Sequence, residues 1–330
     1  MGEKKIKHIL ISQEELNHIL KIDELFYSKS WREAVVRGTE SENFGVLTSY
    51  KGDNALLGIY FKKEESFFKL VGSPLPGTFT PYLEPIWLLE LDEKEKQKIF
   101  SSHAQFIKSL GFSYIEYRFF NYDEAESLNK EVNFSLKEFY NYVLELNDFE
   151  NIIKNVSSVC KKKIKMAKES EVVIERVEAC MIDVEDYYFM LKAVYEAKGK
   201  KLIHSFEFFK EIFHRMQEDN KLFFIRAVFE NRIISMMIFL YDKEKMVWLG
   251  GVSVDTAKEM GVECAMMEKA VKFAYSKRLK ILDFNRKGDK ELDFLKESFN
   301  AKPHKCGELF YKTSIVKSAE TVYKKLKRLS

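Results

Sequence analysis

The side chains best suited to chemistry lie on a short strand-like segment near the C-terminal end of the chain. Residues Ile281–Asn285 are apolar except for Asp283 and Asn285, and Arg286 and Lys287 follow them directly. A carboxylate in an apolar setting can take up or position a proton. It can equally be a buried structural group that pairs with Arg286 or with a helix N-terminus. Arg286 and Lys287 can bind an anionic ligand.

Two basic segments and one histidine are further candidates. The lysines Lys161–Lys163 belong to a predicted helix that extends to Ala167 and has lysines flanking an apolar face. Such a helix can bind phosphate, an anionic membrane or acidic side chains, and it can equally be a solvated surface helix. His204 ends a basic connector that begins at Gly199. A single histidine in a loop is more often a bystander than a catalyst.

The elements that must position these side chains alternate between strands and helices. The order hairpin, strand, helix, strand, helix, strand predicts a mixed α/β unit with a cleft beside its central strands. The strand-like run 246–252, the third in this order, contains the pair Gly250-Gly251. The expected strands are 222–229, 232–241, 246–252, 281–285 and 309–313, and the expected helices are about 261–276 and 289–299.

The same order of elements occurs earlier in the chain, which predicts a tandem repeat. Gly72 precedes Gly251 by 179 positions, and Glu116 precedes Asp283 by 167 positions. The first copy therefore contains twelve additional residues between these points, and the Gly/Pro-rich segment 77–88 has that length. We interpret this segment as a loop insertion in one of two related units.

The composition bounds the class of protein. With 330 residues the chain has room for two domains, which we place at residues 1–147 and 148–330. The apolar fraction of 46% excludes general disorder, and the net charge of +3 argues against a dedicated nucleic-acid binder. The four cysteines are scattered, which favours free thiols in a reducing compartment. No secretory signal or spanning segment is evident, so we predict a cytoplasmic protein.

Several short motifs together resemble the Fem/CelD-like acyltransferases. They are the segment 26–31 (FYSKSW) with the hairpin after it, Pro81–Pro85, Lys161–Ala167 and Asp283–Arg286. The resemblance covers nearly the whole chain in order and spacing, and it implies two tandem GNAT-type domains. The peptidoglycan-bridge members of this family pass an amino acid from aminoacyl-tRNA to the amine of a lipid-linked or nucleotide-linked muropeptide. The CelD-like members of the family are regarded as acyl-CoA transferases of polysaccharide or envelope synthesis.

The resemblance implies a donor site where two central strands of the second copy diverge, followed by a loop whose N–H groups can face a pyrophosphate. The loop sequence 258–263 (KEMGVE) keeps one glycine of the family pattern, but Glu263 stands where a small residue is expected. A carboxylate beside phosphate would repel it unless it turns away, which leaves room for a donor other than a CoA thioester. The expected donor-binding residues are Gly250, Gly251, Ser253, Lys258 and Gly261.

The reaction implied by the resemblance is attack of an acceptor amine on an activated carbonyl. It needs a base or water chain for the amine proton and N–H donors for the oxyanion. The first copy lacks the glycine loop, so we expect residues 1–147 to be non-catalytic and to shape the acceptor pocket. The expected catalytic residues are Asp283, Asn285 and Arg286, and the expected acceptor-binding residues are Tyr82, Lys161, Lys162 and His204.

Two functions stay open at this point. One is an acyltransferase that uses acyl-CoA or aminoacyl-tRNA as co-substrate and acts on a small-molecule or lipid-linked amine, without a metal, in cell-envelope synthesis. The other is a catalytically silent GNAT-fold protein that binds an anionic sugar or peptide, which Glu263 favours. A basic amphipathic helix predicted at 315–329 would be solvated or make weak contact with the inner face of the membrane.

Overall fold

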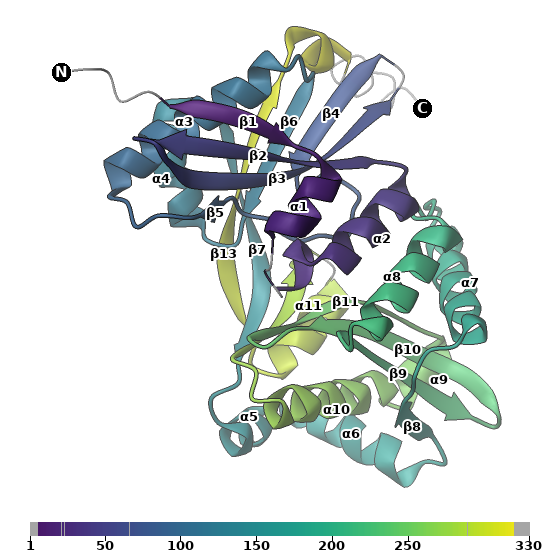
Figure 1. Cartoon of the computed structure of the whole chain (residues 1–330). Coiled ribbons are helices and arrows are strands. Elements are labelled where there is room, and N and C mark those ends of the chain that lie inside the picture. Colours follow the sequence, from purple (N-terminus) through teal and green to yellow (C-terminus); the bar gives the residue numbers. More distant parts are fainter. Residues whose placement is uncertain (1–5, 21, 23, 66, 289, 320–330) are drawn as a thin grey trace. The chain divides into compact units, whose positions relative to one another are not determined.

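A computed structural model describes residues 6–319 except residues 21, 23, 66 and 289 (Figure 1). The chain forms two compact units. Unit 1 comprises Met1–Ile22, Thr39–Phe139 and Lys305–Ser330, and unit 2 comprises Asp23–Gly38 and Tyr140–His304. None of the helices in the described part of the chain combines the length and the hydrophobicity needed to span a bilayer. Most of the helix expected at 315–329 lies outside the described residues.

The two compact units differ in three segments from the predicted domains, which divide the chain after residue 147. Residues 23–38 and 140–147 belong to unit 2, whereas residues 305–330 belong to unit 1. The early segment is held in unit 2 by packing: Glu33 forms an ion pair with Arg215, and a Cβ at Gly38 would come within 2.6 Å of the Phe208 Cα atom. Such contacts between distant parts of a chain leave no signal in local composition.

Unit 1 is a mixed sheet with two long helices on one face. Its elements are β1 (Lys7–Ile11), α1 (Gln13–Ile19), β2 (Glu42–Tyr50), β3 (Asp53–Glu65), β4 (Phe68–Ser73), β5 (Ile86–Trp87), α3 (Glu93–Ser109), β6 (Tyr114–Phe119), α4 (Tyr122–Val132) and β13 (Lys302–Lys312). The strand order is β1-β2-β3-β4-β6-β13, with β5 paired to β3. Only the pair β4 and β6 is parallel among these described strands. Buried side chains of α3, α4 and the sheet form one core.

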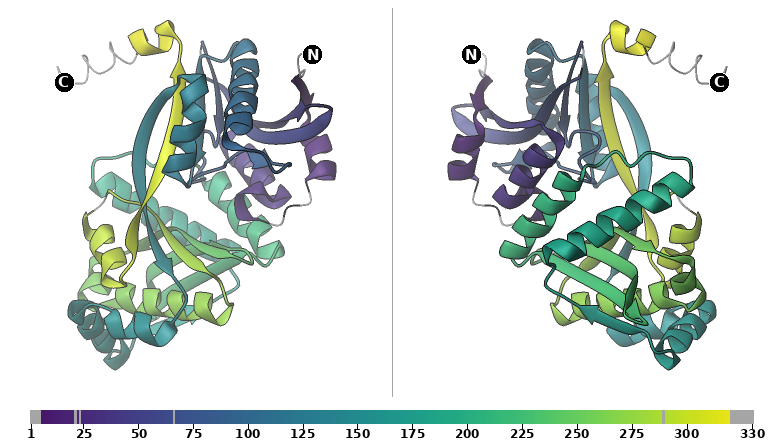
Figure 2. Two further views of the ribbon diagram at one scale, coloured as in Figure 1. Left: turned by 90° about the vertical axis from the view of Figure 1, so that its left-hand side faces the viewer. Right: turned by 90° about the vertical axis from the view of Figure 1, so that its right-hand side faces the viewer.

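Unit 2 is a mixed sheet with helices on both faces (Figures 1 and 2). Its elements are η1 (Leu25–Tyr27), α2 (Lys29–Thr39), β7 (Ser135–Glu145), α5 (Phe149–Asn155), α6 (Ser158–Glu169), β8 (Val173–Arg176), α7 (Met181–Ala197), α8 (Phe206–Glu218), β9 (Leu222–Phe229), β10 (Arg232–Tyr241), β11 (Lys245–Ser253), α9 (Asp255–Glu259), α10 (Val262–Ser276), β12 (Ile281–Arg286) and α11 (Lys290–Ser298). The strand order is β7-β12-β11-β10-β9-β8, and the pair β11 and β12 is parallel.

Side chains of β9 alternate between the two faces of the sheet and contact the helices on each face. Successive strand side chains point to opposite faces of a sheet. Phe223 accordingly stacks on Phe273 of α10 with ring centroids 4.1 Å apart, whereas Phe224 meets Phe213 of α8 edge-on at 5.1 Å. The face toward α10 also buries α6 and α11, and the opposite face carries α7 and α8.

Each unit repeats the order hairpin, strand, helix, parallel strand and helix, which confirms the tandem GNAT-type fold predicted from the sequence. The closing strands are exchanged between the repeats. The C-terminal strand β13 pairs with β6 in unit 1, and β7, which follows the first repeat, pairs with β12 in unit 2. This exchange accounts for two of the three segments in which the compact units differ from a division after residue 147.

One part of the sequence match is wrong. Gly72 pairs with Glu116 in unit 1, whereas Asp283 pairs with Val247, four residues before Gly251. The strand β4 ends at Ser73, one residue after the position that corresponds to Val247, so unit 1 has no strand counterpart of residues 249–253 of β11. Spacing alone could not reveal this because a shortened strand and an inserted loop compensate each other in length.

Candidate functional site

The central feature of unit 2 is the divergence of β11 and β12. These parallel strands pair at Lys245–Ile281, Met246–Leu282 and Val247–Asp283 and no further among the described residues. Both strands continue, β11 to Ser253 and β12 to Arg286. The predicted separation of the central strands is therefore confirmed, and backbone groups of β11 beyond Val247 have no strand partner on the β12 side.

Irregular pairing on both outer sides accompanies the divergence. The register of β10 and β11 shifts between Ile238 and Phe239, opposite Gly250 and Trp248. The register of β12 and β7 shifts between Asp283 and Arg286. A bulge bends and twists the strand that carries it. The two bulges thus turn β11 and β12 away from each other at the same level of the sheet.

Glycine is required where β11 leaves its partner. A Cβ at Gly250 would lie 3.2 Å from the Tyr187 hydroxyl oxygen of α7. A Cβ at Gly251 would lie 3.1 Å from Cγ of Met237 and 3.2 Å from the Met236 carbonyl oxygen. All three distances are tighter than ordinary van der Waals contact. The glycine pair lets the α7 side chain and the neighbouring strand approach the unpaired part of β11.

Asp283 is completely buried at the last position of β12 that pairs with β11. Its carboxylate accepts hydrogen bonds from the Asn141 side-chain Nδ2 at 3.1 and 3.2 Å and from the Asn285 backbone N–H at 2.7 Å. Buried carboxylates need such donors, because an unsatisfied charge in the interior is costly. The geometry holds Asp283 in one orientation beside the point where the strands part.

The residues after Asp283 form a tight, braced turn. Asn285 has a left-handed backbone with φ of 63°, and its side-chain oxygen accepts a hydrogen bond from the Arg286 N–H at 2.8 Å. The Arg286 carbonyl accepts a hydrogen bond from the buried Lys296 ammonium at 2.7 Å, and Asp293 lies 3.5 Å from the same ammonium. The exposed Arg286 side chain is thus carried on a fixed backbone.

Ser253 and the turn after it are tied into the protein. The Ser253 hydroxyl lies 2.8 Å from the Ser235 hydroxyl of β10. Lys258 of α9 forms exposed ion pairs with Asp255 and Glu291. Backbone N–H groups of residues 257, 258, 260 and 261 bond carbonyl oxygens of the same turn.

Gly261 occupies a packing position at the start of α10. Its φ is 74°, and a Cβ there would come within 2.5 Å of the Lys163 carbonyl oxygen of α6. The left-handed backbone and the close approach both account for glycine. Glu263 follows in the first turn of α10. The turn between α9 and α10 thus packs closely against α6.

The expected acceptor-binding residues lie on separate elements. Lys161 and Lys162 are exposed on α6, and the Lys161 ammonium bonds the Lys154 carbonyl at 2.6 Å. His204 packs its ring 4.9 Å from Phe208 between α7 and α8. Tyr82 belongs to unit 1, where it is buried against Phe120.

The corresponding place in unit 1 is closed by the inserted loop. The Leu83 N–H bonds the Arg118 carbonyl of β6 at 3.2 Å, and the Ser73 hydroxyl bonds the Leu83 carbonyl at 2.7 Å. Glu116 is paired with Arg118 at 2.5 Å, and burial raises the pKa of its carboxyl group. The loop therefore occupies the end of β4, where unit 2 has its diverging strands.

Sequence reasoning missed three residues of the site. Asn141, Tyr187 and Trp248 come from β7, α7 and β11. The Asn141 amide oxygen and the Trp248 indole N–H are buried and have no hydrogen-bond partner within the described protein. Buried polar groups without partners are rare and call for an explanation such as a ligand or water. A signal for Asn141 existed, since it is a polar residue inside the apolar run 139–146.

Comparison with known proteins supports the fold. No protein-family model matches the sequence, and a search of curated proteins finds no match. Among solved structures, FemX is similar over 91% of this chain and 96% of its own, with 11% identity and a TM-score of 0.65. A tandem GNAT protein from the clavulanic acid biosynthesis pathway is similar over 93% and 98%, with 5% identity and a TM-score of 0.58. L-PGS from Bacillus licheniformis is similar over 92% and 96%, with 10% identity and a TM-score of 0.54.

These likenesses define the class of fold. The chain has the tandem GNAT-type architecture, with FemX among its structural neighbours. The resemblance to Fem/CelD-like proteins that the motifs suggested therefore holds for the fold along nearly the whole chain.

Proposed function

We propose that this chain transfers an acyl or aminoacyl group to an amine, with the reacting carbonyl seated in unit 2 between the diverging parts of β11 and β12. The observation that carries the proposal is the end of parallel pairing at Val247 and Asp283, beside the glycine pair of β11. Unpaired backbone N–H groups of β11 can stabilise an oxyanion there. The similarity to FemX and to a tandem GNAT protein agrees with this reaction class.

In the proposed reaction the acceptor nitrogen forms a bond to the donor carbonyl carbon. The carbon–oxygen bond of an ester donor, or the carbon–sulfur bond of a thioester donor, then breaks. One proton leaves the nitrogen and the leaving group gains one. Asp283 would orient the amine through its carboxylate, and the Asn141 amide oxygen is available to accept a second N–H hydrogen. Arg286 would face an anionic part of the donor or acceptor.

The turn between α9 and α10 favours an aminoacyl ester over acyl-CoA as donor. A pyrophosphate cradle needs free N–H groups at a helix N-terminus. Here Gly261 is packed against the Lys163 carbonyl at the start of α10, and Glu263 places a carboxylate in the first turn of this helix. Unit 1 would contribute no chemistry, because its inserted loop fills the equivalent place. The exposed Lys162 and the half-buried His204 are candidates for contact with the acceptor.

A matched pair of variants tests the proposal. Acyl loss from labelled aminoacyl-tRNA and from acyl-CoA is measured with and without a panel of primary amines. We expect amine-dependent loss of the acyl group from one of the two donors. After correction for the folded fraction, the rate of this loss should be at least 100-fold lower in Asp283→Asn than in the parent. The rate in Glu116→Gln should lie within twofold of the parental rate.

Three outcomes are informative. Equal rates in Asp283→Asn and the parent would remove Asp283 from the mechanism. Loss of activity in Glu116→Gln alone would move the reaction to unit 1. No transfer with either donor would favour the silent binding protein, for which the fully hydrogen-bonded Asp283 is a purely structural group.

A further inference from the structure

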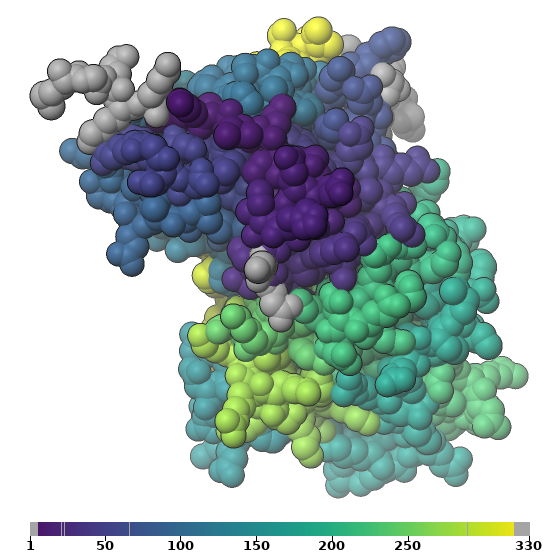
Figure 3. Space-filling view, viewed as in Figure 1, coloured from purple at the N-terminus to yellow at the C-terminus, as the bar shows by residue number. Residues whose placement is uncertain are grey.

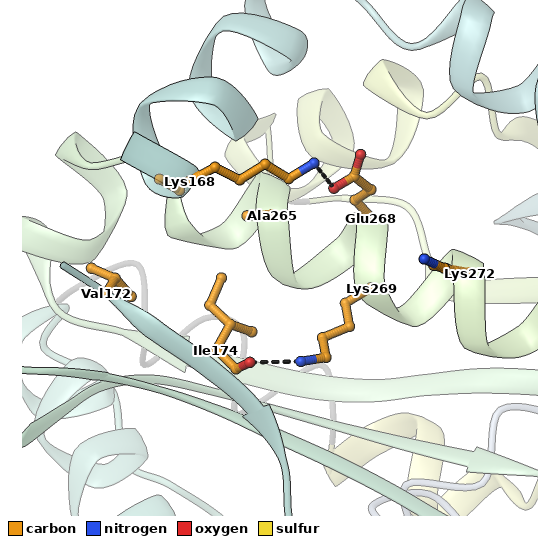
Figure 4. A pocket seen from close by; sticks show the side chains of 8 residues that line it. Lys168, Val172, Ile174, Ala265, Glu268, Lys269 and Lys272 are labelled. Carbon is orange, nitrogen blue, oxygen red and sulfur yellow. Dashed lines mark hydrogen bonds and ion pairs between the residues drawn. The ribbon is translucent and has the colours of Figure 1, made fainter. Parts of the chain in front are cut away.

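A groove in unit 2 shares no residue with the gap between β11 and β12 (Figure 4). It has a volume of about 360 Å³ and lies between the C-terminal end of α6, the edge strand β8 and the outer side of α10. Its floor is apolar and is formed by Ala167, Val172, Ile174 and Ala265. A cavity of this size falls within the range of small-molecule sites.

The rim of the groove is basic and partly fixed in place. The Lys168 ammonium lies 2.6 Å from a Glu268 carboxylate oxygen, and the Lys269 ammonium donates to the Ile174 carbonyl at 2.6 Å (Figure 4). Each ammonium group has three N–H donors, so these contacts leave further donors available. Lys272 is exposed on the same side of α10, and no ion pair is found for it among the described residues.

The positive charge continues beyond the groove. The sequence of α6 contains five lysines and one glutamate. Arg176 of β8 places its guanidinium 4.9 Å above the ring of Phe273, the neighbour of Lys272 on α10. The yellow-green atoms of α10 lie at the surface of unit 2 in Figure 3. Two of the nearby carboxylates are already paired, Glu169 with Lys165 and Glu175 with Arg226, so an anion that approaches this side of unit 2 meets several cations.

We propose that this groove binds an organic phosphate, with the phosphate at Lys168, Lys269 and Lys272 and an apolar or planar group on the floor. Lysine binds phosphate as a point charge, and a phosphate offers acceptors to more than one ammonium group. Small side chains on the floor leave the room that the rest of the ligand needs. Lys168 and Glu268 form an ion pair, so Lys269 and Lys272 supply the net positive charge at the phosphate while Lys168 contributes N–H donors. The proposal does not depend on the transfer reaction.

Calorimetry with the full chain tests the ligand class. The probes are AMP and dihexanoyl phosphatidic acid, each against its counterpart without phosphate, adenosine and dihexanoylglycerol, and inorganic phosphate alone. We expect saturable one-to-one binding of an organic phosphate, at least tenfold tighter than its counterpart and than inorganic phosphate. Binding of AMP would identify the ligand as a nucleotide, and binding of dihexanoyl phosphatidic acid would identify it as a lipid. Binding of neither phosphate below millimolar concentration would overturn the proposal, and so would equal binding of the counterparts.

Three variants locate the binding. Lys272→Glu should weaken the organic phosphate at least tenfold without changing the thermal midpoint, because this side chain is exposed. Ala265→Met should fill the floor and weaken the organic phosphate while leaving inorganic phosphate unchanged. Lys98→Glu, an exposed lysine of α3 in unit 1, is the matched control and should bind as the parent does. Unchanged affinity in Lys272→Glu would contradict the site. Asp283→Asn should retain full binding, so a failure of the proposed transfer reaction remains distinguishable.

Discussion

Two completely buried polar residues, His103 and Asp283, differ in what their hydrogen bonds leave open. His103 uses both ring nitrogens, one with the Thr48 hydroxyl at 2.7 Å and the other with the Tyr60 hydroxyl. Asp283 is held by Asn141, whose amide oxygen is buried without a partner. A saturated network rigidifies a core, whereas an open acceptor beside a carboxylate is available to a ligand. We therefore regard the His103 network as a structural feature of unit 1, and Asp283 with Asn141 as the candidate reactive groups of unit 2.

Removal of the Asn141 amide should affect catalysis more than binding. Asn141→Ala leaves the buried Asp283 carboxylate without its side-chain donor, which costs about 1–3 kcal/mol of stability. We expect kcat to fall at least tenfold while KM for the donor changes less than threefold. Asn147→Ala, an exposed asparagine just beyond β7, is the control. A parental kcat in folded Asn141→Ala would show that Asn141 only fills space.

The stability of unit 1 should decrease in acid through His103. Burial lowers the pKa of His103 to about 3, whereas its ordinary value is 6.5. Between these values the unfolded chain binds a proton that the folded chain does not bind. The free energy of unfolding therefore falls as pH decreases from 6.5 toward 3, by up to about 1.4 kcal/mol per pH unit. The neighbouring His8 changes in the same direction because burial lowers its pKa too.

Urea titrations read by hydrogen exchange of β2 and β3 can measure this dependence at several pH values. His103→Gln should flatten the slope between pH 6.5 and 4, whatever its effect on the absolute stability. His214→Gln changes an exposed histidine of α8 and is the control, because α8 belongs to unit 2 and the exchange is read in β2 and β3 of unit 1. Identical slopes in His103→Gln and the parent would refute the assignment.

At the scale of elements, the two units differ in strand length and strand pairing, and the proposed donor site depends on this difference. The sequence was sufficient to predict the hairpins, the parallel strands and the amphipathic helix α10, because hydrophobic period and glycine positions signal them locally. It could not show where pairing stops. Val247 and Leu249 have the same residue character, yet only Val247 pairs with β12. That difference arises from bulges formed with β10 and β7, which are tertiary features.

A methyl group on the unpaired part of β11 should block transfer. Gly250→Ala places a Cβ 3.2 Å from the Tyr187 hydroxyl, so we expect a loss of about 1 kcal/mol in stability and at least a tenfold loss of turnover. Tyr187→Phe in the same chain removes the crowded oxygen and should restore stability. Turnover should stay low in the double variant because the methyl group remains in the gap. Parental turnover in Gly250→Ala would mean that the reacting group lies elsewhere.

At the scale of the whole molecule, the two repeats have the same fold, and we propose that only unit 2 carries out the transfer reaction. The tandem repeat and its insertion could be predicted from the order of elements. The exchange of β7 and β13 could not, because the partner of each strand lies far away in the sequence. The membership of residues 23–38 in unit 2 depends on distant contacts such as Glu33 with Arg215. The proposed difference in function rests on the insertion, in which the Leu83 N–H bonds the Arg118 carbonyl of β6.

Hydrogen exchange of the backbone amides with a non-reactive donor analogue tests the central claim most directly. In the free protein, amides of β11 that face away from β10 beyond Val247 lack a strand partner and should exchange quickly. We predict that an aminoacyl-RNA or acyl-CoA analogue slows exchange at residues 248–253 and 284–286 and leaves β4 and β6 unchanged. Protection of β4 and β6 instead, or no protection in β11 by an analogue that binds, would contradict the account.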